Sequence, residues 1–200
     1  LTTDNAIDYL VRSTTFASAI TADEDAMAMI GSYDYASDEL TSDSTWLTAI
    51  ASSSYRTSIY NVYAPKMTSN TTPSGECLAS SYYSADTYKP WHAFDDVIAQ
   101  GDEWIANTGT NAWIGYKFTK QIKALSIWFK NRIHSSDVNT FPTSYKIEGS
   151  NDGTNWTAIT DTITRPSAKL VSGGEDFTVI TTPSLYQYYR AYIFDKSAGI

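Results

Sequence analysis

Two stretches of the chain, residues 80–92 and 131–141, combine aromatic rings with hydrogen-bonding side chains. Sugars present flat apolar faces ringed by hydroxyls, so their binding sites pair an exposed aromatic platform with a few polar groups. The two stretches therefore offer the residue types that a carbohydrate site uses. Each candidate residue alone also suits a packing or surface role. A binding site therefore requires that at least two of the candidates lie together. The candidates for ligand contact are Tyr83, Tyr88, His92, Arg132, His134 and Asn139.

Catalytic chemistry has little support in the residue types. The acids Asp95, Asp96, Asp102 and Glu103 are the nearest approach to the paired carboxylates of a glycosidase. The chain has only two histidines and carries neither G-x-S-x-G, nor H-E-x-x-H, nor a glycine-rich phosphate loop. We therefore expect that the chain is not an enzyme.

Charge and cysteine content exclude further classes of function. The net charge is −8, and residues 1–64 carry most of it, with nine acidic residues against Arg12 and Arg56. Nucleic-acid binding needs clustered Lys and Arg, which neither part of the chain offers. No run approaches the roughly 18 apolar residues that a membrane span requires. Cys77 is the only cysteine, so an internal disulfide is impossible, and it suits a small buried residue at a strand start better than a reactive thiol.

The first sixty residues contain a ten-residue repeat. Each unit has an apolar i, i+3, i+4 pattern preceded by Ser, Thr or Asp, which predicts one short helix per unit. In a single straight helix the apolar stripe would turn by about 80° per unit and leave any fixed partner. Short helices are marginal alone, so we expect them to bury Phe16, Met29, Trp46 and Ile50 against neighbouring units or other copies of the chain, with a homotrimer as the expected oligomer. An ordinary helical bundle with accidental periodicity is the alternative. The repeat phase is marked by Leu10, Ile20, Ile30, Leu40, Ile50 and Tyr60.

The character of the sequence changes after residue 64. Residues 65–75 are rich in Pro, Ser, Thr and Gly, which predicts a linker between residues 1–64 and residues 76–200. Further on, the apolar period approaches two, which is typical of strands. At least five strands without an amphipathic helix predict a β-sandwich or barrel, so the fold class is α followed by all-β. The predicted strands cover residues 113–118, 122–129, 144–147, 177–180 and 188–194.

Five motifs follow one another along the second part of the chain. They are Ala93-Phe94-Asp95-Asp96, Trp104, residues 112–116, residues 142–156 and Tyr188-Tyr189-Arg190. In this order they resemble the discoidin, or coagulation factor 5/8 type C, domain. The strongest is residues 147–156, where an Asn-Asp-Gly turn joins two strands and Trp156 follows. The resemblance implies a jelly-roll β-sandwich over about residues 75–198, with ligand loops at one end, and bacterial members act as carbohydrate-binding modules. It also implies that aromatic residues such as Trp91 and Trp104 belong to the core.

The sequence departs from the family pattern at two points, which concern metal binding and the last strand of the sandwich. The family often has Asp-Gly where this chain has Asp95-Asp96, and Gly gives the turn its freedom there. The family also continues into a closing strand with a Glu, so we expect the sandwich to lack its last strand. No cofactor is required by the residues. The resemblance implies Asp95 as the ligand of a structural calcium ion, and capping of nearby amides is its other role.

The short-helix repeat looks like those of bacteriophage tail-fibre and other appendage proteins. We therefore expect a virion-surface, extracellular protein of a phage tail or head fibre, whose β-sandwich binds a cell-surface glycan for host attachment. The alternative is a structural decoration or cement protein that binds other virion proteins. In either case we expect a homo-oligomer, with no nucleic-acid partner and no membrane insertion.

Overall fold

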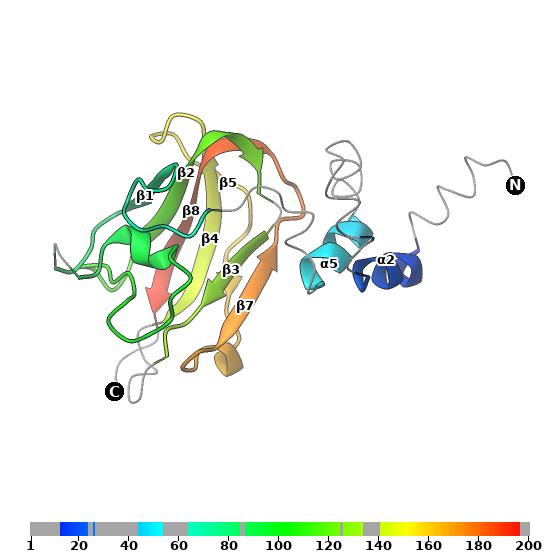
Figure 1. The fold of residues 1–200 in the computed structure, drawn as a ribbon, viewed down its shortest axis with the longest axis horizontal. Helices are drawn as coiled ribbons and strands as arrows, with labels where there is room; N and C mark the ends of the chain where they lie inside the picture. Colours follow the sequence, from blue (N-terminus) through cyan, green and yellow to red (C-terminus); the bar gives the residue numbers. More distant parts are fainter. Residues whose placement is uncertain are drawn as a thin grey trace, which may run out of the picture. The chain divides into compact units, whose positions relative to one another are not determined.

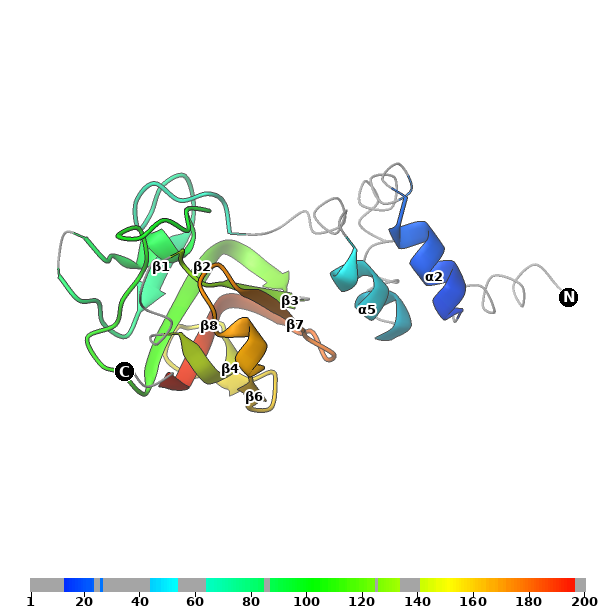
Figure 2. The same cartoon turned by 90° about the horizontal axis from the view of Figure 1, so that it is seen from below.

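The computed structural model describes residues 13–23, 26, 44–53, 64–84, 87–124, 126–133 and 141–196. The chain divides into two units, one of residues 1–63 with 179–183 and the other of residues 64–178 with 184–200. Figures 1 and 2 show short helices in the first unit and strands in the second. None of the helices in the described ranges is long and apolar enough to cross a membrane.

The described residues of the first unit include two short helices, α2 (Thr14–Thr21) and α5 (Ser44–Ser52). The side chain of Ser13 caps α2 by accepting a hydrogen bond from the amide of Phe16 at 3.3 Å. The rings of Phe16 and Trp46 meet edge to face with centroids 5.9 Å apart, and Trp46 and Ile50 are buried. The predicted apolar contacts therefore form within one chain at this point.

These two helices begin where the ten-residue repeat predicts a helix start. The remaining units of the repeat, including Met29, lie outside the described residues. The array of short helices as a whole therefore stays a prediction.

Antiparallel pairing builds the larger sheet of the second unit. Its order is β1 (Glu76–Ala79), β2 (Ala112–Lys123), β8 (Leu185–Lys196), β4 (Pro142–Ser150) and β5 (Thr157–Ala158), and β6 (Ile163–Thr164) also pairs with β4. A second sheet consists of β3 (Ser126–Lys130) and β7 (Glu175–Val179). Short 3-10 helices occur at η1 (Pro90–Ala93) and η2 (Ser167–Lys169). Four of the five predicted strands are present in β2, β4, β7 and β8, with ends that differ by a few residues. The fifth, predicted over residues 122–129, is wrong as a single strand, because its residues divide between the end of β2 and β3, which belong to different sheets.

The two sheets pack face to face, which is the β-sandwich that the alternating pattern predicts. The ring of Phe129 in β3 lies 4.6 Å from that of Tyr145 in β4, and the Tyr145 hydroxyl is 2.7 Å from the hydroxyl of Thr178 in β7. Tyr145 and Ile147 are almost fully buried, as are Ala191 and Ile193 of β8. Because successive strand residues point to opposite faces, these positions form the core.

The opposite face of the large sheet carries a stack of aromatic and charged side chains. The Arg190 guanidinium lies 4.0 Å from the centroid of the Trp156 ring and 5.2 Å from that of Trp113. Two of its nitrogens bond Glu148 at 2.6 Å, and Lys146 reaches the same carboxylate at 2.6 Å. Burial raises the pKa of Glu148, but the hydrogen bonds and charges of Lys146 and Arg190 outweigh burial and hold it below its ordinary value.

The predicted Asn-Asp-Gly turn closes the hairpin after β4. Gly153 has a φ of +72°, a left-handed conformation that glycine adopts without steric cost. The Asp152 carboxylate accepts hydrogen bonds from the amides of Thr154 and Asn155, at 2.8 and 2.7 Å. The Asn155 side chain and these amides lower the pKa of Asp152. The local sequence therefore specifies this turn.

The prediction of a linker over residues 65–75 is wrong. Met67 is 1% exposed and forms a buried cluster with Cys77 and Tyr116. Its amide donates to the carbonyl of Phe94 at 2.9 Å, and the amide of Cys77 donates to the carbonyl of Asn70 at 2.7 Å. Polar and Pro/Gly-rich composition marks irregular backbone, and here that backbone is held against the sandwich rather than left free.

Candidate functional site

Three loops meet at one end of the sandwich. The predicted ligand stretches are joined by a third loop, residues 95–107. The amide of Tyr83 donates to the carbonyl of Ile105 at 2.7 Å, and the amide of Ile133 donates to the carbonyl of Ile98 at 2.6 Å. The Trp104 indole donates to the carbonyl of Ser81 at 3.0 Å. These bonds connect residues 80–88 and 131–133 through the third loop.

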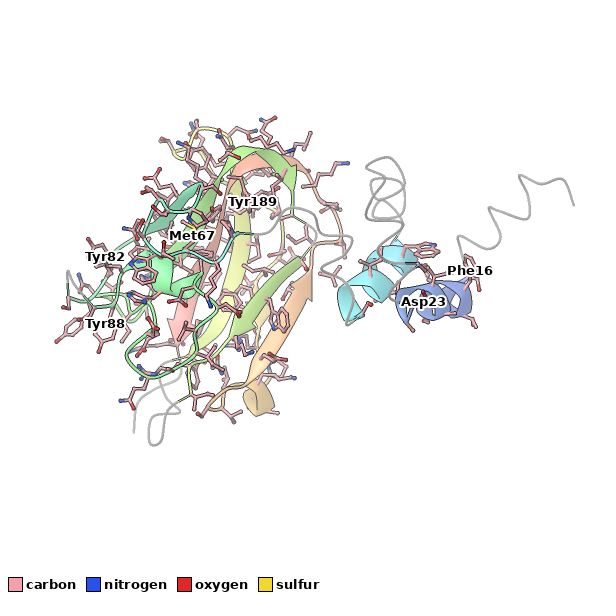
Figure 3. The ribbon with its side chains drawn as sticks, in the orientation of Figure 1. Phe16, Asp23, Met67, Tyr82, Tyr88 and Tyr189 are labelled. Carbon is pink, nitrogen blue, oxygen red and sulfur yellow. The ribbon has the colours of Figure 1, made fainter. Side chains whose placement is uncertain are left out.

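Two of the predicted contact residues form an aromatic pair. The rings of Tyr83 and Tyr88 have centroids 6.2 Å apart and are tilted by 35°, and Tyr83 is 60% exposed. Tyr82 and Tyr88 lie on the same edge of the sandwich in Figure 3. The pair thus offers a ligand an accessible apolar surface.

Each remaining candidate either contacts a carboxylate of the protein or lies outside the residues that the structure describes. Arg132 forms an ion pair with Glu103, and each of these side chains is 13% exposed. The Arg132 Nε is buried without a hydrogen-bond partner among the described residues. The Arg132 side chain is thus largely buried and paired with Glu103, which leaves little of it accessible to a ligand. His134 and Asn139 lie outside the described residues.

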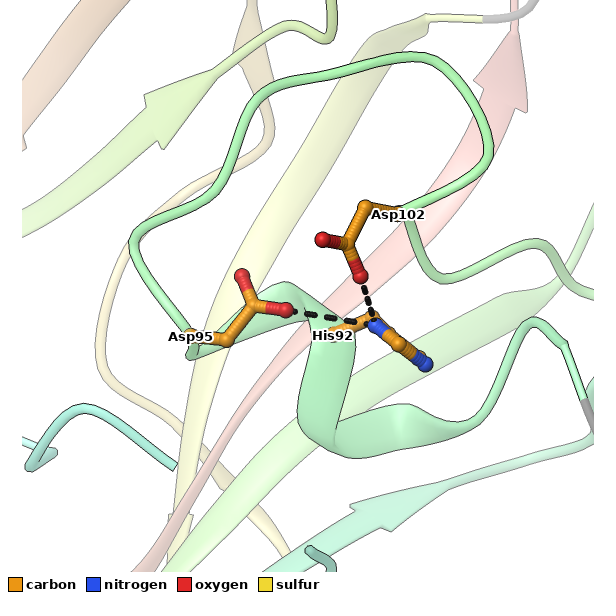
Figure 4. A group of neighbouring side chains, drawn as sticks. All are labelled: His92, Asp95 and Asp102. Carbon is orange, nitrogen blue, oxygen red and sulfur yellow. Dashed lines mark hydrogen bonds and ion pairs between the residues drawn. The ribbon is translucent and has the colours of Figure 1, made fainter. Parts of the chain in front are cut away.

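His92 faces two carboxylates rather than the aromatic pair (Figure 4). Its Nδ1 lies 3.2 Å from Oδ2 of Asp95 and also contacts Oδ1 of Asp102. Asp95 is 3% exposed, and its other oxygen accepts a hydrogen bond from the amide of Val97 at 2.8 Å. Burial raises the pKa of Asp95, and the nearby Asp102 adds to this, whereas the amide of Val97 and His92 oppose it.

These donors fit calcium poorly. Calcium takes six to eight oxygen ligands, whereas the group that faces Asp95 here is an imidazole nitrogen. The capping role predicted for Asp95 is seen in its bond to Val97. Asp96 has a φ of +61°, the left-handed conformation that the family's usual Gly supplies at this turn.

A cavity of about 600 Å³ opens beside these loops. Tyr82 and Trp91 contribute rings, and Lys89 contributes an ammonium group. The Asn70 side-chain oxygen accepts a hydrogen bond from the amide of Trp91 at 3.2 Å, which fixes residues 68–71 beside η1. The lining residues are Thr68, Ser69, Asn70, Thr71, Tyr82, Lys89 and Trp91.

Two features concealed this cavity in the sequence. Residues 68–71 have the composition of a linker, and Trp91 matches a core position of the resembled family. Trp91 does pack against the cluster of Met67, Cys77 and Tyr116, but it is only partly buried and also lines the cavity. The sequence feature that could have indicated this site is the run of hydroxyl and amide side chains just before β1.

Comparison with known proteins assigns the fold to a family. The model of the F5/8 type C domain matches residues 77–187, which is more than half of the chain, so the chain belongs to this family. No curated protein matches the sequence.

Several solved structures are similar to the second unit. CpGH89CBM32-5 from Clostridium perfringens, in complex with GalNAc-beta-1,3-galactose, is 13% identical with a TM-score of 0.50, over 61% of this chain and 85% of that chain. Chitosan-binding module 1 of a chitosanase/glucanase from Paenibacillus sp. IK-5 is 23% identical with a TM-score of 0.47, over 62% and 87%. The family 32 carbohydrate-binding module of C. perfringens NanJ, in complex with galactose, is 18% identical with a TM-score of 0.47, over 61% and 83%. The family match and the likeness to CpGH89CBM32-5 thus show a discoidin-like β-sandwich fold.

Proposed function

We propose that this chain binds a cell-surface glycan at the loop end of its β-sandwich and catalyses no reaction. The observation that carries the proposal is the cavity lined by Tyr82, Trp91 and residues 68–71. Its volume of about 600 Å³ lies within the range of about 300–1,000 Å³ typical of small-molecule sites. One or two sugar rings are the matching ligand size.

The chemistry of the lining supports a sugar over an apolar ligand. The Tyr82 and Trp91 rings offer apolar surfaces for the face of a pyranose, and Tyr82 is 38% exposed. Around them, the hydroxyls of Thr68 and Thr71 and the amide of Asn70 offer hydrogen bonds to sugar hydroxyls. The loop that carries Tyr82 also carries the ring pair of Tyr83 and Tyr88, of which Tyr83 is exposed and Tyr88 is half-buried.

We further propose that the chain belongs to a phage tail or head fibre, on the virion surface, and serves in host attachment. Support comes from the ten-residue repeat before the sandwich and from the two short helices that begin at predicted repeat starts. Residues 1–64 of three chains would form an oligomeric stalk, and the homotrimer would carry three copies of the site on it. Several weak sites then bind a cell surface with an avidity that no single site provides.

A glycan array probed with the labelled full-length chain tests the sugar-binding proposal. It should include galactose, GalNAc-β-1,3-galactose and chitosan oligosaccharides, with a Tyr82→Ala variant as matched control. We expect wild-type signal on at least one glycan and a reduced signal for the variant. Absence of signal on every glycan, with tight binding to a capsid or baseplate protein, would instead establish the structural decoration role.

Light scattering at micromolar concentration tests the oligomer separately. We expect the mass of a homotrimer for the full-length chain. A monomeric mass would remove the stalk from the proposal and favour an ordinary helical bundle for residues 1–63.

A further inference from the structure

Three side chains with metal-binding atoms converge on one point of the sandwich. His92 belongs to η1, Asp95 follows η1, and Asp102 lies further along the same loop. One nitrogen and two carboxylate oxygens from these residues all lie within 4.8 Å of one another. Figure 4 shows both carboxylates directed at the same imidazole nitrogen.

The charges around His92 favour the binding of a cation. Asp95 and Asp102 bring two carboxylates to one imidazole, and the Asp95 side chain is only 4% exposed. Burying a carboxylate beside a second one is costly, and positive charge between the two lowers that cost. A divalent metal ion supplies such charge.

We propose that His92, Asp95 and Asp102 bind one zinc-type divalent transition-metal ion. Zinc accepts imidazole nitrogen and carboxylate oxygen as ligands at about 2.0–2.2 Å, commonly in tetrahedral geometry. Such bonds place neighbouring ligand atoms about 3.3 Å apart. Nδ1 of His92 and Oδ2 of Asp95, which are 3.2 Å apart, already have about this spacing, and the three ligand atoms all lie within 4.8 Å of one another, so small side-chain movements bring all three to one ion. The site therefore differs from the all-oxygen calcium site that the family resemblance implies.

The surroundings hold two of the three ligands in place. The amide of Val97 holds one Asp95 oxygen at 2.8 Å, so that the other oxygen faces His92. The His92 ring stacks on the ring of Trp91 with centroids 3.7 Å apart. Such supporting contacts orient metal ligands in proteins. Asp102 is 35% exposed, which leaves the fourth position to water.

Calorimetric titration of the tag-free, chelator-treated full-length chain with ZnCl₂ and separately with CaCl₂ tests the proposal. We expect one zinc ion per chain and at least tenfold weaker zinc binding in His92→Phe, which keeps the aromatic stack but removes the nitrogen. Asp102→Asn should also bind at least tenfold more weakly. Asp96→Asn, which changes an exposed carboxylate of the same loop, should bind zinc as wild type does.

Circular dichroism verifies that each variant is folded, and zinc should raise the melting temperature of wild type but not of His92→Phe. Undiminished zinc affinity in both folded ligand variants would overturn the proposal, as would the absence of zinc binding by wild type. Tighter binding of calcium than of zinc would also overturn it and establish the calcium site. A glycan-binding result does not affect any of these outcomes.

Discussion

Met67→Ala is the sharpest test of the finding that residues 64–75 belong to the sandwich. Met67 is 1% exposed and packs with Cys77 and Tyr116, with Trp91 and Phe94 around them. If this segment were a linker, truncating the side chain would have almost no effect on stability. Because it is part of the core, the substitution should lower the free energy of unfolding substantially.

The size of the loss follows from the contacts. Alanine removes three heavy atoms of the buried side chain, which corresponds to about 2.4 kcal/mol at about 0.8 kcal/mol each. The cavity left behind adds to this, and the usual range for Met→Ala in a core is about 2–5 kcal/mol. The Tyr116 hydroxyl, which lies 3.7 Å from the Met67 sulfur, keeps its bond to the carbonyl of Ser74. We therefore expect a loss of about 3 kcal/mol, with no added cost for an unpaired hydroxyl.

Urea denaturation followed by tryptophan fluorescence measures this loss. Five of the six tryptophans lie in the second unit, so the signal reports mainly on the sandwich. Lys66→Ala, at the exposed neighbouring position, should change stability by less than about 0.5 kcal/mol. Met67→Leu, which nearly conserves volume, should cost less than about 1.5 kcal/mol. A loss below about 0.5 kcal/mol for Met67→Ala would refute the reasoning.

Four further predictions concern the site, the thiol, the helices and acid stability. Tyr82→Ala should weaken binding of the glycan found on the array by about 1–3 kcal/mol in calorimetry, more than Tyr83→Ala does, because Tyr82 lines the cavity; equal losses would move the site to the tyrosine pair. Burial raises the pKa of Cys77 to about 12, with the charge of Glu76 adding to this, so folded protein at pH 8 should resist a thiol reagent that labels it rapidly in urea. Trp46→Asp should unfold the helical unit, seen as lost ellipticity at 222 nm, because burying an unpaired carboxylate costs several kcal/mol; unchanged ellipticity would contradict the packing of α2 on α5. Because the pKa of Glu148 is lowered in the fold, its contribution to stability is complete above the unfolded value of 4.5 and is lost as pH falls through the folded pKa, so the stability difference between wild type and Glu148→Gln should shrink below about pH 4.5.

Short-range patterns of the sequence were sufficient for the strands and turns. The period-two segments predicted every long strand, and the Asn-Asp-Gly sequence predicted a turn in which Gly153 adopts a positive φ. The single cysteine was correctly predicted to be buried at a strand start. These features depend on side-chain alternation and local backbone freedom, and both are properties of a few neighbouring residues.

The site depended on contacts that no local pattern encodes. Composition alone does not distinguish a free polar segment from one that packs on a sheet, so residues 68–71 were mistaken for linker although they line the cavity. Trp91 packs against the core and also lines the cavity, and the residue type alone does not reveal that one side chain does both. The pairing of His92 with Asp102, ten residues away, depends on how the loop after η1 returns to it. The sequence by itself determined the strands, the turn and the loops rich in polar and aromatic side chains. The tertiary structure decided which side chains share one place, because loop paths are fixed by long-range hydrogen bonds and packing.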